Sequence, residues 1–191
     1  LNHIAGQQKL EKLSRIRTVS SEINSLIVRV HDRQKLLEET CRIAVEHGGF
    51  GIAWIGMLDQ KTLEIIPAAC AGVEADSLMT TSHNTARPDT PLGQGIVGRA
   101  IRARRPVLSN DLAAETSQGG ARRQEAVRRG YRSLIALPLL VEDKAAGSLS
   151  LFAKELNFFD DEEITLLTEL ASNVSFALDL IQKGEALADS E

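Results

Sequence analysis

Cysteine and aromatic residues are scarce in this sequence. Its 191 residues include two cysteines, one tryptophan, one tyrosine and five phenylalanines. The two cysteines, Cys41 and Cys70, cannot form the disulfide framework of a small secreted domain, which indicates a reducing compartment. So few aromatic rings argue against a surface on which nucleic-acid bases stack. We therefore expect a cytoplasmic protein that does not bind nucleic acid.

Further absences narrow the class of protein. No apolar run approaches the roughly 20 residues that span a bilayer, and no secretory signal is visible, so no membrane segment is expected. The net charge of -4 argues against a general nucleic-acid binder. His83 has no second histidine or cysteine at metal-ligand spacing, so no metal site is expected. The composition, 43% hydrophobic and 25% charged, is that of an ordinary globular domain.

Residues 131–159 contain the clearest pattern in the chain, which predicts two strands joined by a polar turn. Residues 134–141 are an unbroken apolar run, typical of a strand covered on both faces. Residues 147–152 alternate serine with larger apolar residues, typical of a second strand. The polar residues between them predict a five-residue loop over 142–146.

The register of this hairpin decides what each face of the sheet carries. A five-residue loop places Leu139 opposite Leu149 and Leu137 opposite Leu151, so one face would bury leucines against helices. A face with small residues at its centre leaves room for a small molecule. The alternative is that small residues let a loop or helix pack closely, which is the more common outcome for the two serines taken alone. The small residues of the second face are Ala136, Pro138, Ser148 and Ser150.

Both ends of the chain are predicted to be helices with narrow apolar seams. In residues 8–30, and in the helix that follows the acidic cap at 160–163, apolar side chains recur at spacings of three and four. One domain would cover two such seams poorly, so we expect the terminal helices to pair with each other and with a second subunit. The predicted dimer interface consists of Ile16, Val19, Ile23 and Leu26 in the first helix and Ile164, Leu167, Ala171, Val174, Leu178 and Ile181 in the last.

The remaining elements follow from local signals. Asp32 is a predicted cap for a helix, and Pro67 indicates an edge position or a bulge in its strand. The predicted helices cover residues 33–47, 74–79, 96–103 and 121–129, the predicted strands cover 50–58, 63–71 and 106–109, and residues 80–91 are predicted to be a loop.

Residues 93–98 read G-Q-G-I-V-G and match the G-x-G-x-x-G pattern of dinucleotide-binding loops. The context differs from that motif, because a loop with Pro88 and Pro91 precedes it and no βαβ unit surrounds it. We interpret these glycines as places where backbone packs against backbone at the start of a short helix.

Positive charge is concentrated between Arg99 and Arg132. This segment has nine arginines, three acidic residues and no lysine. One interpretation is an anion site near the sheet. The interpretation that we favour is that these arginines lie on solvated helix faces and pair with acidic neighbours.

Taken in order, these segments resemble a GAF domain. The resemblance rests on AWIGML, the G-x-G-x-x-G-x-A stretch, RPVLSND, ARRQEAVRRGYRSLIALPLL, GSLSLF and FFDDEEITLLTELASNVSFAL, and it covers roughly residues 14–182. It implies an α/β (α+β) fold with a central antiparallel sheet of five or six strands. Terminal helices would pack on one face, and a ligand pocket would lie on the other.

The sequence is most similar to GAF domains of bacterial multidomain sensors. Such domains stand beside PAS, histidine-kinase, diguanylate cyclase or phosphodiesterase modules, which implies two-component or cyclic-di-GMP signalling. Because the sequence begins at Leu1, we expect a segment of a longer protein. Residues 1–13 would extend the first helix, residues 14–182 would form the sensor domain, and residues 183–191 would link it to an output domain.

Several signatures of GAF subfamilies are missing. The chain lacks the N-K-x(n)-F-x(3)-D-E arrangement of cyclic-nucleotide-binding members and the bilin-attaching cysteine of phytochromes, so the cofactor stays unknown. It also lacks the clustered cysteines of the free methionine sulfoxide reductases. Cys41 on a helix and Cys70 at a strand end do not supply the spacing of such a site. We therefore expect no catalytic residues and no enzymatic activity.

The predicted function is a regulatory module that binds an unidentified small molecule and relays its state through paired terminal helices. The alternative is a ligand-free dimerisation and relay module whose core is filled by its own side chains. Asp111 is a candidate polar anchor, and Arg132 is the candidate contact for an anionic ligand. The other predicted lining residues are Trp54, Ala136, Pro138, Ser148 and Ser150.

Overall fold

Six strands form one antiparallel sheet in the order β3-β2-β1-β6-β5-β4. The computed structural model describes residues 2–73, 75, 84–114 and 121–190. This sheet confirms the predicted α+β fold with an antiparallel centre. The strands are β1 (Ile52–Leu58), β2 (Glu64–Gly72), β3 (Asn84–Thr85), β4 (Val107–Ser109), β5 (Ser133–Val141) and β6 (Lys144–Ala153).

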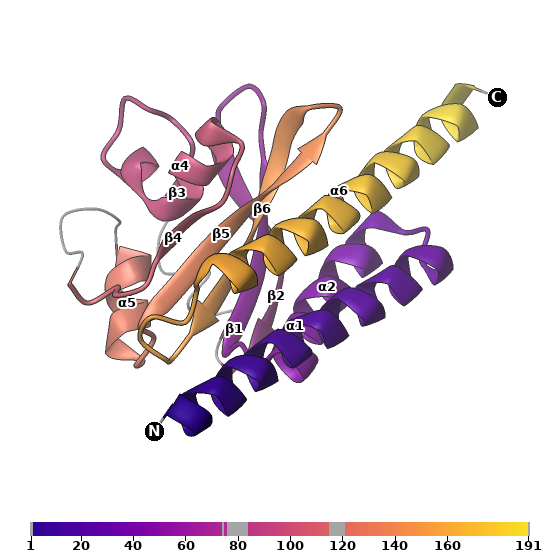
Figure 1. Cartoon of the computed structure of the whole chain (residues 1–191). Helices are drawn as coiled ribbons and strands as arrows, with labels where there is room; N and C mark the ends of the chain where they lie inside the picture. Colours follow the sequence, from indigo (N-terminus) through magenta and orange to yellow (C-terminus); the bar gives the residue numbers. More distant parts are fainter. Residues whose placement is uncertain (1, 74, 76–83, 115–120, 191) are drawn as a thin grey trace.

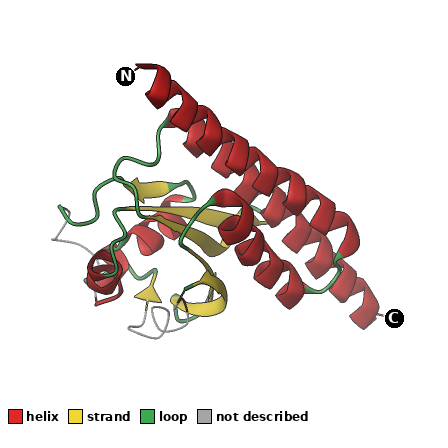
Figure 2. Cartoon of the chain, turned by 90° about the horizontal axis from the view of Figure 1, so that it is seen from below, coloured by secondary structure: helices red, strands yellow, loops and turns green. Residues whose placement is uncertain are grey.

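Helices cover both faces of the sheet, with the long helices on one face and the short helices on the other (Figure 1 and Figure 2). We call the first the helix face; it is covered by α1 (Asn2–Arg29), α2 (Arg33–Gly48) and α6 (Asp161–Ser190). We call the second the distal face; it is covered by α4 (Ile96–Ala103) and α5 (Ala121–Arg128), with the 3-10 helix η1 (Leu92–Gln94) next to α4. Each face has its own buried apolar cluster, so the sheet separates two cores.

Local signals set most element boundaries as predicted. Asp32 caps α2 by accepting a hydrogen bond from the backbone N–H of Lys35 at 2.9 Å. The strand pairing skips a residue next to Pro67, which confirms the predicted bulge. Two-residue β3 lies in a segment predicted to be a loop. The predicted helix at 74–79, Ala75 apart, and His83 lie outside the described residues.

The predicted register of the β5–β6 hairpin was wrong by two residues. Leu137 lies opposite Leu149, and the turn contains two residues instead of five. Both turn residues, Glu142 and Asp143, have positive φ angles of 54° and 64°, as a tight type I′ hairpin requires. A bulge between Leu139 and Leu140 takes up one residue, so the register beyond it moves by an even number and the small residues there keep their predicted face.

The terminal helices α1 and α6 lie side by side and run in the same direction (Figure 1). Near their N-terminal ends, Lys9 Nζ lies 2.8 Å from the fully buried Glu163 carboxylate. Further along, the Asn173 side-chain amide donates to Asn24 Oδ1 at 3.1 Å. These polar contacts, 15 residues apart on α1, fix the register of the pair.

The two seams are covered within one chain, which corrects the reasoning behind the predicted dimer interface. Ile16 and Ile23 in α1 and Leu167 and Val174 in α6 are fully buried in the helix-face core. The seams pack against each other and against the sheet, so they leave no apolar surface that needs a second subunit. The same holds for Val19, Leu26, Ala171, Leu178 and Ile181, which are buried, while Ile164 is partly buried.

Within the described residues, α6 is the one helix whose length and composition would also suit a membrane span. In this fold it is a core helix, because its apolar seam packs into the helix-face cluster.

Candidate functional site

The centre of the distal face brings together five of the seven predicted ligand-lining residues. On β1, Trp54 lies directly opposite Ser150 on β6, and Ser150 in turn lies opposite Ala136 on β5. Ser148 lies opposite Pro138. All five residues are buried. The alternation read from the sequence therefore placed them on one face, although the loop length was wrong.

Three polar atoms at this centre are buried without a hydrogen-bond partner among the described residues. They are the indole Nε1 of Trp54 and the hydroxyl oxygens of Ser148 and Ser150. A buried polar group without a partner costs about 1–3 kcal/mol of stability. Three such atoms on neighbouring strands therefore indicate a place where a bound molecule completes the hydrogen bonding.

The indole of Trp54 occupies its position because residue 56 is a glycine. A Cβ on Gly56 would lie 2.6 Å from Cζ3 of the Trp54 ring and 2.4 Å from Cγ2 of Ile65. The six-membered ring of the indole thus packs on the backbone of Gly56. The partner of Gly56 on β6 is Ser148. The strand sequence A-W-I-G places the large ring and the space for it two residues apart.

Arg122 is the charged residue at this site, and sequence reasoning missed it. It lies in α5, is buried, and holds its guanidinium carbon 4.8 Å from the centroid of the Trp54 ring. That contact is a cation–π interaction. Burial lowers the pKa of Arg122, because removal from water disfavours the charged form. Its only sequence signal was membership in the arginine-rich segment.

Arg132 and Asp111 make hydrogen bonds within the chain, and the ligand contacts predicted for them stay predictions. The guanidinium of Arg132 donates to the carbonyl oxygens of Val127 and Tyr131, at the C-terminal end of α5, where helix carbonyls need donors. The carboxylate of Asp111 accepts from the backbone N–H of Ala114 at 3.3 Å and so closes a local turn. Both side chains stabilise the chain next to the site through these bonds.

Most arginines of the 99–132 segment donate to backbone carbonyl oxygens. Arg102 reaches the carbonyls of Ala86 and Gly93, and Arg123 reaches that of Leu112. Arg128 and Arg129 pair with Glu125, as the favoured interpretation expected. Most of these guanidinium groups therefore stabilise the loops that cover the distal face.

The glycine pattern at 93–98 is structural, as interpreted from its context. A Cβ on Gly93 would lie 1.7 Å from the carbonyl oxygen of Arg87, and one on Gly98 would lie 2.7 Å from that of Thr85. Both glycines therefore allow backbone to pack on backbone where η1 leads into α4.

The family follows from a comparison with protein-family models. The model described as "GAF domain" matches residues 30–179, which is more than half of the chain. The chain belongs to the GAF domain family. A search of curated proteins finds no match.

Solved structures agree with this fold. The GAF domain of a phosphoenolpyruvate-protein phosphotransferase from Coxiella burnetii is 14% identical, with a TM-score of 0.73 over 91% of this chain and 98% of that one. The free methionine-R-sulfoxide reductase of Neisseria meningitidis, in complex with its substrate, is 21% identical, with a TM-score of 0.72 over 88% and 91%. The fRMsr of Staphylococcus aureus, also in complex with substrate, is 21% identical, with a TM-score of 0.67 over 85% and 95%.

The likeness to a reductase corrects the expectation that this GAF domain is not an enzyme. The Neisseria protein is an enzyme with the same fold, so the fold is compatible with catalysis. The missing cysteine cluster was therefore not a sufficient reason to exclude an enzymatic role.

The two thiols of this GAF domain lie in different environments. Cys41 is fully buried in α2, and burial raises the pKa of its thiol far above the ordinary value. Cys70 lies on β2, opposite Trp54 of β1. It is partly buried and packs against the apolar cluster of the distal face. Neither thiol forms a disulfide. Cys70 is therefore the thiol that borders the candidate site.

No three histidine, cysteine, aspartate or glutamate side chains lie close enough to share a metal ion within residues 2–73, 75, 84–114 and 121–190. The donors and hydroxyls of the distal centre instead suit an organic ligand.

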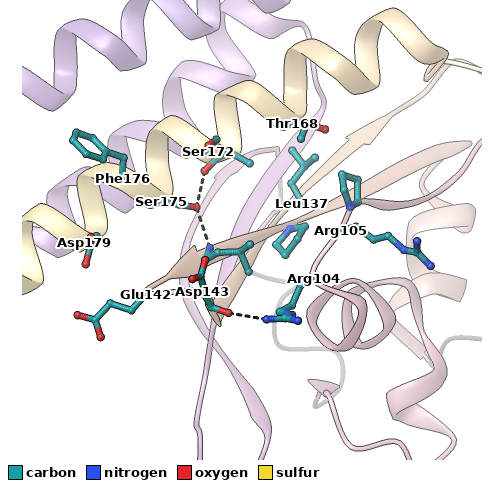
Figure 3. A pocket seen from close by; sticks show the side chains of 14 residues that line it. Arg104, Arg105, Leu137, Glu142, Asp143, Thr168, Ser172, Ser175, Phe176 and Asp179 are labelled. Atoms are coloured by element: carbon teal, nitrogen blue, oxygen red, sulfur yellow. Dashed lines mark hydrogen bonds between the residues drawn. The ribbon is translucent and has the colours of Figure 1, made fainter.

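A groove of about 570 Å³ lies between the outer edge of β5 and α6 (Figure 3). Ser175 of α6 accepts from the backbone N–H of Leu140 at 3.0 Å and donates to the carbonyl of Ala171. Arg104, which follows α4, donates to the carbonyl of Asp143 in the hairpin turn at 3.0 Å. The end of the hairpin is thus bonded both to α6 and to the connection that leaves the distal layer.

Proposed function

We propose that this GAF domain is a regulatory module that binds a small molecule at the centre of the distal face. It would serve a bacterial multidomain signalling protein with a kinase, cyclase or phosphodiesterase output, as the sequence resemblance suggests. The observation that carries the proposal is the group of three unpartnered polar atoms of Trp54, Ser148 and Ser150, with Arg122 against the indole ring.

Energetics favour a ligand over a permanently empty site. Alanine at position 148 or 150 would remove a buried hydroxyl that has no partner among the described residues, and the free protein would gain stability. Proteins keep such destabilising groups where function needs them. The hydroxyls are therefore better explained by a ligand than by packing alone.

A hydrogen bond between β5 and α6 supports the proposed relay to the terminal helices. Strand β5 carries Ala136 and Pro138 at the site, and two residues further on Leu140 is bonded to Ser175 of α6. A ligand that shifts the end of β5 would therefore change the position of α6, which continues toward the C-terminus of the chain (Figure 1).

Three variants test the site. Ser148→Ala and Ser150→Ala should each raise the free energy of unfolding of the free protein by roughly 1 kcal/mol. Each should also reduce the thermal shift produced by any compound that stabilises the wild type, in a screen of nucleotides, amino acids and haem. The matched control is Ser133→Ala, because Ser133 is equally buried but donates to the carbonyl of Glu155 at 2.7 Å. This control should destabilise the protein by about 1–3 kcal/mol.

The alternative, a ligand-free relay module, makes the opposite prediction. In that case no compound produces a thermal shift that depends on Ser148 or Ser150, although the two alanine variants still stabilise the free protein.

We also propose a homodimer. Its interface would be the exposed outer side of α6 instead of the buried seam that the sequence predicted. Phe176, Leu180 and Leu187 are exposed at spacings of four and seven, which places them in one stripe opposite the buried seam. Leu180 also borders an apolar groove of about 350 Å³ between α6 and the end of α1. A second copy of α6 has the apolar, heptad-spaced stripe that fits this surface.

A further inference from the structure

Within the part of the chain that the structure describes, the buried polar side chains at the centre of the distal face are hydrogen-bond donors or hydroxyls. An indole N–H and a guanidinium can only donate, and a serine hydroxyl can donate or accept. Among the described residues, the only buried carboxylate in the chain is Glu163, which lies far from this face, beside Lys9 and Lys12. The described part of the site therefore supplies donors and lacks a buried carboxylate acceptor.

We propose that the ligand of this GAF domain presents an anionic group, a carboxylate or a phosphate, to Trp54 Nε1, the two serine hydroxyls and the Arg122 guanidinium. This inference rests on the proposed function, because it names the chemistry of a ligand bound at that same site.

The register of the sheet brings these groups within reach of one small molecule. Trp54 and Ser150 are direct neighbours on adjacent strands, at a cross-strand spacing of about 5 Å. Ser148 lies two residues from Ser150 on the same face of β6. Arg122 approaches the indole ring from α5, which packs over the sheet. Residues from β1, β6 and α5 thus lie close enough together to contact one small molecule.

Electrostatics favour an anion over a neutral acceptor at this point. Hydrogen bonds to a charged group are roughly twice as strong as neutral ones, and they strengthen where water is excluded. Burial against an aromatic ring lowers the pKa of Arg122, so a negative charge nearby would stabilise its protonated form. A cationic ligand would instead meet a buried guanidinium and be repelled.

Matched pairs of compounds test the proposal at constant ionic strength. The probes are N-acetyl amino acids with their amides, 2-oxo acids with their amides, nucleoside 5′-monophosphates with their nucleosides, and sugar phosphates with the parent sugars. The expected result is that an acidic member raises the melting temperature while its neutral partner does not. The first two sets report a carboxylate ligand, and the last two report a phosphate ligand.

Variants connect the response to these residues. Arg122→Met and Trp54→Phe should each weaken binding of the active acid by roughly 10- to 100-fold in isothermal titration. Arg122→Lys keeps the charge and guards against a variant that fails to fold, and it should weaken binding less than Arg122→Met. The control is Arg128→Met, which removes an exposed arginine from the same helix and should leave the affinity unchanged.

The outcomes distinguish the anionic class of the ligand from the proposed ligand-binding function. If neutral members bind as well as acidic ones, and Ser148→Ala and Ser150→Ala abolish that binding, the anionic class is wrong while the proposed function stands. If Arg128→Met weakens binding as much as Arg122→Met, the assignment of Arg122 is wrong. If no compound shifts the wild type, both the ligand class and the proposed function are overturned.

Discussion

Gly56 is the residue on which the shape of the candidate site depends most directly. The Trp54 ring and Ile65 occupy the space that any side chain at this position would need. Gly56→Ala should lower the free energy of unfolding by about 1–3 kcal/mol, as overpacking of a core does. It should also shift the emission maximum of Trp54, which is the only tryptophan in the chain and therefore an unambiguous probe.

A second glycine provides the control for this change. Gly184 lies inside α6, and a Cβ there would meet nothing within 4 Å. Gly184→Ala should stabilise the protein by up to about 1 kcal/mol, through helix propensity alone. Unchanged tryptophan emission in Gly56→Ala would show that the indole does not rest where the structure places it.

Residues of the site could be predicted from sequence where a strand determines their direction. Trp54, Ser148 and Ser150 were found because alternation assigns each strand residue to a face. Arg122 was missed because the choice among nine arginines depends on how α5 docks on the sheet. The short α5 has no clear apolar stripe that would fix this orientation, since three of its eight residues besides Arg122 are charged.

At the scale of the elements, Ser175 joins α6 to the unpaired outer edge of β5. Strand β4 pairs only with residues 134–136, so the next outward-facing positions are Pro138, which has no N–H, and Leu140, whose N–H is accepted by Ser175. This end of the edge therefore offers no free donor to an incoming strand, which protects the sheet from edge-to-edge association.

Loss of this contact should be measurable. Ser175→Ala leaves the Leu140 N–H without its acceptor and should cost about 1–3 kcal/mol in urea unfolding. The amide of Leu140 should also exchange with solvent faster in the variant than in the wild type. Ser172→Ala is the control, because Ser172 is exposed on the same helix and borders the same groove, and it should stay within about 0.5 kcal/mol of the wild type. Equal exchange rates at Leu140 in both variants would remove Ser175 from the relay path.

Elements were predicted more reliably than the connections between them. The helix at 96–103 was predicted at its observed bounds, because its apolar positions are regular. The β5–β6 turn was predicted too long, because Glu142 and Asp143 adopt positive φ angles without the glycine or asparagine that normally announces such a turn. Tertiary pairing of two strongly apolar strands determined this turn, and local sequence did not.

At the scale of the whole molecule, periodicity could not identify the partner of each seam. A spacing of three and four predicts that a helix buries a narrow stripe, and it says nothing about what covers that stripe. Here the α1 seam meets the α6 seam some 150 residues later in the same chain, as the Lys9–Glu163 and Asn24–Asn173 contacts show. The expected pairing of the terminal helices with each other is therefore confirmed, and their contact with a second subunit stays a prediction.

The burial of the seams changes which substitutions test a dimer. Val174→Lys and Leu178→Lys should unfold the protein, because each places a charge in the helix-face core. Phe176→Glu with Leu180→Glu should instead keep the fold, since these side chains are 60% and 49% exposed. If the outer stripe forms the dimer, this double variant should raise the dimer dissociation constant by roughly 30-fold or more, because buried aromatic anchors dominate such interfaces.

Sedimentation across a range of concentrations measures this constant, and circular dichroism confirms that the fold is kept. A wild type that stays monomeric at every concentration would end the dimer proposal, whereas a dimer that survives the double variant would place the interface on another surface.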